Sequence, residues 1–265
     1  MPATQGFQFV EGDLAFLQHA YVLRLATIDH LAALSGRSYK QTQNRLSKLE
    51  ERHYLKRVTR RPQKHVYTVG REGALVLIEQ GFAPHELAAA RLRQHELKEF
   101  GLRHAVFIAD IHVKLLQLAK ERSFAISKWV EGSTLWDSVT TNSNDVIPIR
   151  PDAWFAIGTK GNDSHFFLEA DRGTMAHSRM REKISGYAAY FQQQRHLKKY
   201  DGMKSFRVAI ITETRGRANG LREEFRAMMP ASWFAAYPVV AFEDLTLQSL
   251  MPGVTENAQV GRDAR

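Results

Sequence analysis

Acidic residues at the ends of two expected strands are the side chains of this sequence best suited to chemistry. Asp152 opens one apolar run directly after Pro151, and Glu169, 17 residues later, ends the next run together with Asp171. Because side chains on neighbouring strands meet where the strands end, we expect Asp152 and Glu169 to converge. Mg²⁺ takes one or two protein carboxylates and fills its other positions with water and phosphate oxygens. The pattern therefore indicates a site for Mg²⁺ or Mn²⁺ that activates water and offsets charge on a phosphoryl group.

The same carboxylates have a structural interpretation. Glu169 and Asp171 lie on one face of the expected strand, where two like charges repel unless a cation compensates them. Arg172, Arg179 or Lys183 could supply that cation in a salt-bridge network. Such a network is typical of a fold kept for binding DNA or a partner, so the sequence leaves both interpretations open.

The elements that carry these residues follow from a change in hydrophobic period near residue 121. Apolar residues three and four apart give way to short apolar runs that predict strands. The predicted elements are helix 102–121, strands 124–130, 152–157 and 165–170, helix 174–195, strand 206–211, helix 218–228 and strand 237–242. This order predicts an α/β or α+β sandwich.

The net positive charge of the chain lies within residues 35–71, which we call the basic window. The formal net charge of the whole chain is +9, and the window alone holds eleven Lys and Arg against two Glu. All other residues therefore sum to zero. A confined basic segment is typical of a nucleic-acid-binding module, and a solvated basic face is the alternative.

The basic window falls on predicted helices and a hairpin. Asp13 and Thr27 can cap the first two helices, and Gly36 can end the second by adopting a left-handed conformation. Ser38 opens a third helix that runs to about Arg52. Strands at 54–59 and 64–69 and a helix around 75–78 follow.

The third helix has the side chains of a recognition helix. Leu46 and Leu49 face the core, whereas polar and basic side chains crowd the first two turns. The first residues of such a helix reach base edges in the major groove. The residues predicted to bind double-stranded DNA are Arg37, Tyr39, Lys40, Gln41, Gln43, Asn44, Arg45, Lys48, Arg60, Arg61 and Lys64.

The order helix, helix, turn, helix and two-stranded hairpin over residues 13–81 resembles the winged helix-turn-helix domains of bacterial regulators. The resemblance implies that Arg60, Arg61 and Lys64 lie at the tip of a wing. Winged helices also serve as protein-interaction modules, so that alternative stays open. The sequence also leaves open a homodimer, whose DNA site would be palindromic.

The second region is similar to the PD-(D/E)XK nuclease-like superfamily through Pro151-Asp152 and Glu169-Ala-Asp171. Active members usually have Lys two residues after the Glu, where this chain has Asp171. Lys183 on the next helix is then implied to take over, with Tyr187 four residues on and on the same face. The residues implied to be catalytic are Asp152, Glu169, Asp171, Lys183 and Tyr187, and those implied to hold the metal are His104, Asp152 and Glu169.

A longer sequence pattern makes the resemblance specific to one family. It runs from Pro151-Asp152-Ala-Trp-Phe through Phe167-Leu-Glu169-Ala-Asp171-Arg172-Gly173-Thr174 to Lys183-Ile-Ser-Gly-Tyr187. Placed after a winged helix, it is similar to the bacterial replication-relaxation family, which is encoded on plasmids and other mobile elements. The resemblance covers residues 10–245 and implies a DNA-binding protein of replication, relaxation or mobilisation, with replication or mobilisation proteins as partners. An active Mg²⁺-dependent DNA endonuclease is the alternative, and the missing Lys after Glu169 favours binding.

Other classes of chemistry are excluded by what the sequence lacks. With no cysteine, the chain has no disulfide, thiolate metal site or cysteine nucleophile. It also has no phosphate-binding Gly-x-x-x-x-Gly-Lys-Ser/Thr, no dinucleotide fingerprint, no Gly-x-Ser-x-Gly and no relaxase-type histidine cluster. Because no apolar run approaches the ~20 residues of a membrane span and no signal-peptide pattern begins the chain, we expect a cytoplasmic protein without membrane contact.

We therefore predict an α+β protein. Its expected parts are a winged helix-turn-helix domain at 10–81, a linker helix at 82–99, a PD-(D/E)XK nuclease-like sandwich at 100–250 and a flexible tail at 251–265. The tryptophans are expected in the core or at domain contacts and are Trp129, Trp136, Trp154 and Trp233.

Overall fold

The computed structural model describes residues 7–58, 65–86, 98–141, 144–159, 162–200 and 203–252. The chain divides into two compact units, residues 1–113 and 114–265, which both combine helices with a sheet, so the predicted α+β class is confirmed. The predicted wing tip with Arg60, Arg61 and Lys64, most of the predicted linker helix and most of the predicted tail lie outside the described residues. Within the described part of the chain, every helix is too short or too polar to span a membrane.

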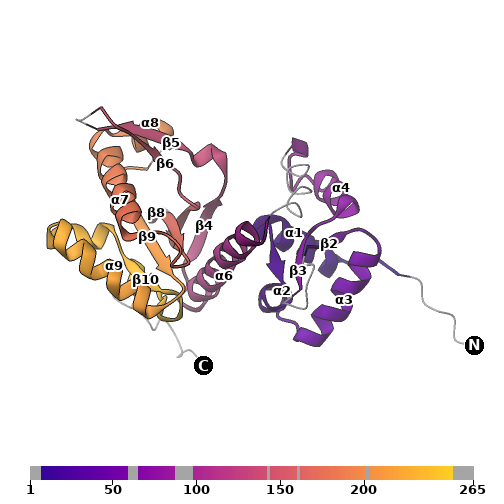
Figure 1. Ribbon diagram of the computed structural model, residues 1–265. Helices are drawn as coiled ribbons and strands as arrows, with labels where there is room; N and C mark the ends of the chain where they lie inside the picture. The colour runs from indigo at the N-terminus through magenta and orange to yellow at the C-terminus, as the bar shows by residue number, and fades with distance from the viewer. Residues whose placement is uncertain are drawn as a thin grey trace, which may run out of the picture. The chain divides into compact units, whose positions relative to one another are not determined.

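The first unit is a group of helices around a small antiparallel sheet (Figure 1). Its described helices are α1 (Glu11–Leu23), α2 (Ile28–Ser35), α3 (Tyr39–Glu51), α4 (Arg71–Glu79) and residues 99–113 of α6 (Glu99–Glu121). Its strands are β1 (Ala26–Thr27), β2 (Leu55–Arg57) and β3 (Val66–Val69), paired in the order β1-β3-β2. The sequence predicted the helices and the hairpin of β2 and β3 but not β1, because two residues have no detectable period.

Helix boundaries in the first unit follow local signals. The side-chain oxygens of Thr27 and Ser38 accept backbone N–H groups in the first turns of α2 and α3, as predicted. Gly36 ends α2 with φ +68°, in the left-handed region that glycine favours. Asp13 acts differently from the prediction, because it lies inside the first turn of α1. From there its Oδ2 accepts the backbone N–H of Val10 at 2.8 Å.

The core of the first unit joins all its described helices. Among the buried side chains are Phe16, Leu17, Leu31, Leu46, Leu49 and Leu77. Ala109 and Val113 of α6 belong to the same core. A continuous apolar face on one helix gives no sign that residues 99–113 and 114–121 belong to different compact units, and the sequence predicted a second domain from residue 100 onward.

The second unit is built on a mixed sheet whose described strands have the order β10-β9-β8-β7-β4. The strands are β4 (Ala125–Val130), β7 (Ala153–Thr159), β8 (Asn162–Asp171), β9 (Arg207–Thr212) and β10 (Val239–Ala241). Strands β4, β7 and β8 are antiparallel neighbours, whereas β8, β9 and β10 run parallel. The parallel strands are connected through helices α7 (His177–Gln192) and α9 (Arg215–Met228), which cover one face of the sheet (Figure 1).

A second hairpin packs against α7. It consists of β5 (Asp137–Thr140) and β6 (Val146–Ile149), in a segment where the sequence predicted no strand. A Cβ atom placed on Gly186 of α7 would lie 2.7 Å from Ile147 Cγ2, so the hairpin approaches the helix closely at this glycine. The short elements of this unit are 3-10 turns at Ser133–Leu135, Ala231–Ala236 and Phe242–Asp244 and helices α8 (Arg195–Lys199) and α10 (Leu247–Leu250).

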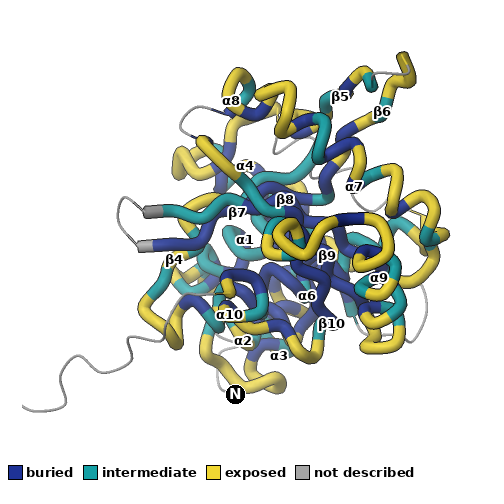
Figure 2. Tube along the Cα trace, turned by 90° about the vertical axis from the view of Figure 1, so that its left-hand side faces the viewer, coloured by how far each residue is buried: buried dark blue, intermediate teal, exposed yellow. Residues whose placement is uncertain are grey.

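The central strands β7, β8 and β9 are deeply buried (Figure 2). On one face of the sheet Phe155 and Phe166 stack with ring centroids 4.9 Å apart. Because successive side chains on a strand point to opposite faces, Phe167, Glu169 and Asp171 share the other face, which α7 and α9 cover. The sheet thus places both acidic residues of β8 beneath two helices.

We expect Gly73→Ala in α4 to destabilise the first unit by about 1–3 kcal/mol. A Cβ atom at Gly73 would lie 2.1 Å from the backbone oxygen of Tyr54, which cannot move aside as a flexible side chain can. Urea denaturation followed by circular dichroism measures the change. Gly216→Ala in α9 is the control, because a Cβ there meets nothing within 4 Å; it should stabilise by about 0.5 kcal/mol. Equal effects of the two changes would contradict the role of Gly73.

Candidate nucleic-acid interface and carboxylate cluster

The carboxylate of Glu169 is buried between β8 and α7. Tyr187 Oη donates a hydrogen bond to Glu169 Oε1 at 2.7 Å, and Lys183 Nζ forms an ion pair with Oε2. Lys183 and Tyr187 reach the same carboxylate because residues four apart share a face of α7. Glu169 is only 2% exposed, so both oxygens depend on protein donors.

Asp152 lies beside this group, at the start of β7. Its Oδ2 accepts the backbone N–H of Ala170 at 2.8 Å, and its own N–H donates to the Leu168 oxygen at 2.9 Å. The charge of Asp152 acts on both Glu169 and Lys183. The structure therefore brings together Asp152, Glu169, Lys183 and Tyr187, which we call the carboxylate cluster.

The surroundings of the carboxylate cluster raise the pKa values of Glu169, Lys183 and Tyr187. Burial raises the pKa of Glu169, Lys183 opposes this increase, and Asp152 adds to it. Burial alone would lower the pKa of Lys183, but the carboxylates of Glu169 and Asp152 reverse this effect and raise it. Burial and Glu169 together hold the pKa of Tyr187 well above its ordinary value. At neutral pH, Lys183 is thus a charged ammonium and Tyr187 a neutral donor.

Asp171 has a separate cation, which the sequence analysis missed. Arg217 Nε donates to Asp171 Oδ2 at 2.8 Å, and the Gly173 N–H donates to Oδ1 at 2.7 Å. Arg217 lies in the first turn of α9, where Thr214 caps the helix. Nothing in the sequence pattern pairs Arg217 with Asp171, because parallel strand β9 and the turn before α9 bring them together.

The ion-pair network suggested by the sequence is therefore present, but some of its basic residues pair with other partners than expected. Lys183 pairs with Glu169, as the structural interpretation allowed. Arg172 instead pairs with Glu213, its Nε lying 2.7 Å from Oε1. Each acidic side chain at this end of β8 thus has a basic partner from another element.

The donor set does not suit a Mg²⁺ ion in this arrangement. Mg²⁺ keeps several waters when it binds protein carboxylates, whereas Glu169 is buried and both its oxygens hold protein donors. His104 lies on α6 in the first unit, and Asp152 and Glu169 lie in the second. Among the described residues, no group of three or more His, Asp or Glu side chains could hold a metal ion. The catalytic and metal-binding roles stay predictions.

Helix α3 presents a polar face to solvent in the first unit. Thr42, Leu46 and Leu49 are buried on its inner side. The exposed side chains are Tyr39, Lys40, Gln41, Asn44, Ser47, Lys48 and, at the end of the helix, Glu51. Gln41 has a local task as well, because its Oε1 accepts the backbone N–H of Ser38 at 3.2 Å.

Arg45, one of the residues predicted to bind DNA, is directed inward. Its Nε donates to Oδ1 of the buried Asp13 at 2.6 Å, and its Nη2 donates to the Gln8 oxygen at 2.7 Å. Its guanidinium also lies 4.9 Å from the centre of the Phe7 ring. These contacts tie α3 to α1 and the residues before it, so Arg45 serves packing within the unit.

Two further arginines of the basic window cover aromatic rings. The Arg37 guanidinium lies 5.2 Å from the ring centre of Phe16, and that of Arg52 lies 4.5 Å from the ring centre of Phe7. These cation–π contacts hold the side chains against the unit. Lys40, Lys48 and Lys56 carry exposed positive charge on α3 and β2, as does Arg57, which forms an ion pair with Glu50.

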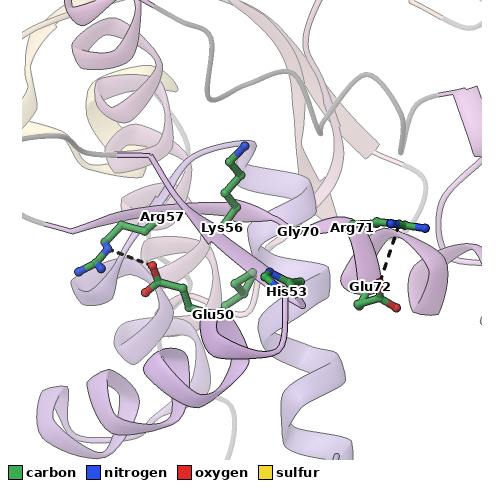
Figure 3. Close-up of a pocket in the computed structure, with 8 residues that line it drawn as sticks. Glu50, His53, Lys56, Arg57, Gly70, Arg71 and Glu72 are labelled. Carbon is green, nitrogen blue, oxygen red and sulfur yellow. Dashed lines mark ion pairs between the residues drawn. The ribbon is translucent and has the colours of Figure 1, made fainter.

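A groove of about 670 Å³ lies between the end of α3, β2 and the start of α4 (Figure 3). Arg57 Nε lies 3.1 Å from Glu50 Oε1, and Arg71 Nε lies 3.9 Å from Glu72 Oε1. Lys56 extends away from both pairs (Figure 3). Because each arginine faces a glutamate, the groove adds little to the positive field of α3.

We expect Lys183→Met to destabilise the protein by about 3 kcal/mol at pH 7, because it leaves Glu169 buried without its cation. The double change Glu169→Gln with Lys183→Met should recover most of this loss. Urea denaturation of the wild type, the two single variants and the double variant gives the coupling energy. A double variant as unstable as Lys183→Met would contradict the assigned pair.

The stability of Lys183→Met should also depend on pH with a definite sign. Without the ammonium, the pKa of Glu169 rises further, so the folded variant binds a proton that the unfolded chain has released above about pH 4.3. The free energy of unfolding, relative to wild type, is therefore highest at acid pH and falls as pH rises. Denaturation at pH 4 and pH 7 checks this; an equal difference at both values would contradict it.

Comparison with known families supplies the context for these sites. The model of the replication-relaxation family matches residues 17–208, a segment that contains α3 and the whole carboxylate cluster. No curated protein and no solved structure matches the chain. Because the matched segment covers well over half of the 265 residues, the chain belongs to the replication-relaxation family.

Proposed function

We propose that this protein binds double-stranded DNA of a plasmid or other mobile element and acts in its replication or relaxation. Membership of the replication-relaxation family supports the process. The exposed face of α3 is the single observation that most supports the contact with DNA. Lys40, Asn44 and Lys48 are spaced four apart and therefore follow one side of the helix, while Leu46 and Leu49 fix the opposite side in the core.

The arrangement of the first unit supports a winged helix-turn-helix domain. Helices α1, α2 and α3 are followed by the antiparallel pair β2 and β3, and β3 also pairs with β1. In such domains the third helix enters the major groove and its first turns contact bases. We assign Asn44 to base contact, since an amide suits adenine, and Lys40 and Lys48 to phosphates.

Replacing Lys40 and Lys48 by Ala together should weaken binding to duplex DNA and reduce the slope of log K against log salt by about 2, because two fewer phosphates are neutralised. Fluorescence anisotropy with a labelled random-sequence duplex at several salt concentrations measures both quantities. Arg45→Gln should instead lower the free energy of unfolding and leave the slope unchanged.

The matched control removes the same charge elsewhere, by Lys120→Ala with Lys128→Ala in the second unit, where both side chains are exposed. An equal loss of slope in the control pair would show that total charge, and not α3, determines binding. That result would refute the assigned interface.

For the second unit we propose a PD-(D/E)XK nuclease-like domain that acts as a scaffold or partner surface. Asp152 and Glu169 from neighbouring strands and Lys183 from the next helix support the likeness. The ion pairs of Glu169 with Lys183 and of Asp171 with Arg217 support a structural use of these charges. The carboxylates are thereby neutralised by protein side chains.

A metal-dependent DNA endonuclease is the alternative, and the convergence of Asp152, Glu169 and Lys183 favours it. Incubating supercoiled plasmid with the protein and Mg²⁺ or Mn²⁺ distinguishes a scaffold domain from an active endonuclease. We expect the plasmid to stay intact. Metal-dependent cutting that Glu169→Gln abolishes and Glu223→Gln, an exposed position on α9, retains would establish the enzyme and overturn the scaffold.

A further inference from the structure

A small cleft at one end of the second unit combines basic and aromatic side chains. It has a volume of about 300 Å³ and is lined by Trp136, Asp137, Arg195, Lys198 and Lys199. Trp136 and Asp137 lie at the start of the hairpin of β5 and β6, and the three basic residues lie on α8. These elements are side by side at the top of the second unit in Figure 1.

Trp136 is 52% exposed, contrary to its expected place in the core or at a domain contact. Its position is nevertheless fixed. The Lys199 ammonium donates to the Trp136 backbone oxygen at 2.6 Å, and the Arg150 guanidinium lies 5.0 Å from the centre of the indole. The preceding residue, Leu135, is buried, and its oxygen accepts a hydrogen bond from Tyr200 at 3.4 Å. The indole is thus an anchored flat surface in contact with solvent.

The cleft carries local positive charge. Asp137 is paired with Arg195, whose Nε lies 3.3 Å from Oδ2. Beyond this pair, Lys198 and Lys199 line the cleft, and Arg150 lies next to it over the Trp136 ring. Arg150 and Lys198 are exposed. An anion with a flat apolar face would satisfy both the ring and the cations.

Unpaired nucleotides have this combination of groups. Bases stack on exposed aromatic side chains while Lys and Arg contact the phosphates, and stacking tolerates any sequence. In a duplex the faces of the bases are covered by their neighbours, so a flat indole has no base to stack on. An acidic peptide would satisfy the cations and leave the ring exposed.

We propose that this cleft binds single-stranded nucleic acid, with one base stacked on Trp136 and adjacent phosphates bound by Lys198 and Arg150. The site is independent of the duplex contact assigned to α3, since it lies on a different unit and reads a different form of nucleic acid.

Fluorescence anisotropy with the full chain and a labelled oligothymidylate of about 12 nucleotides tests the site. Trp136→Ala should weaken binding about tenfold, because a stacked base is lost. Lys198→Ala should lower the salt slope by about 0.7, the value for one phosphate of a single strand. The matched controls are Trp233→Ala, where the indole is 39% exposed in the same unit, and Lys120→Ala; both should leave binding unchanged.

Three results would overturn the site: no binding of the oligonucleotide at low salt, equal losses in Trp136→Ala and Trp233→Ala, or competition by polyglutamate as strong as by unlabelled oligothymidylate. Each variant is also titrated with duplex DNA. Trp136→Ala should retain duplex affinity, and the Lys40→Ala, Lys48→Ala pair should retain oligothymidylate affinity. Failure of the cleft is therefore distinguishable from failure of the duplex interface.

Discussion

The buried carboxylate of Glu169 constrains the second unit more than any other group. A charge removed from water on a central strand needs donors from the element that covers it, and here both come from α7. Their spacing fixes the rotation of α7 on the sheet. Two residues further along β8, Asp171 fixes α9 in the same way through Arg217. The two helices that cover this face are thus each oriented by one acidic side chain of a single strand.

The first unit uses the same physical arrangement between helices. Asp13 is completely buried on α1 and receives its cation from Arg45 of α3. Because Arg45 must face Asp13, the side of α3 that carries Lys40, Asn44 and Lys48 is directed to solvent. Arg45 therefore orients the helix, and Lys40 and Lys48 carry charge that is available to a partner. This division explains how a segment so rich in cations can also belong to a packed core.

The sequence predicted features whose causes are local. Thr27, Gly36 and Ser38 act within one helical turn, and Lys183 was one of three basic residues expected to compensate the charges of Glu169 and Asp171. The sequence did not predict features that depend on residues far apart in the chain. Neither the pairing of Arg217 with Asp171 nor the inward direction of Arg45 has a signal in residue type, because a guanidinium on a helix suits solvent and a buried acid equally. The polar hairpin of β5 and β6 and the exposure of Trp136 likewise depend on packing against α7 and α8.

Because Gly186 has no side chain, the hairpin of β5 and β6 can lie close to α7. Ile147 occupies the volume that a methyl group on Gly186 would need, which lets the hairpin of β5 and β6 lie directly on α7. Trp136 begins that hairpin, whereas Lys199 follows α7 along the chain. A larger residue at Gly186 would press on Ile147 and would have to move this hairpin away from α7.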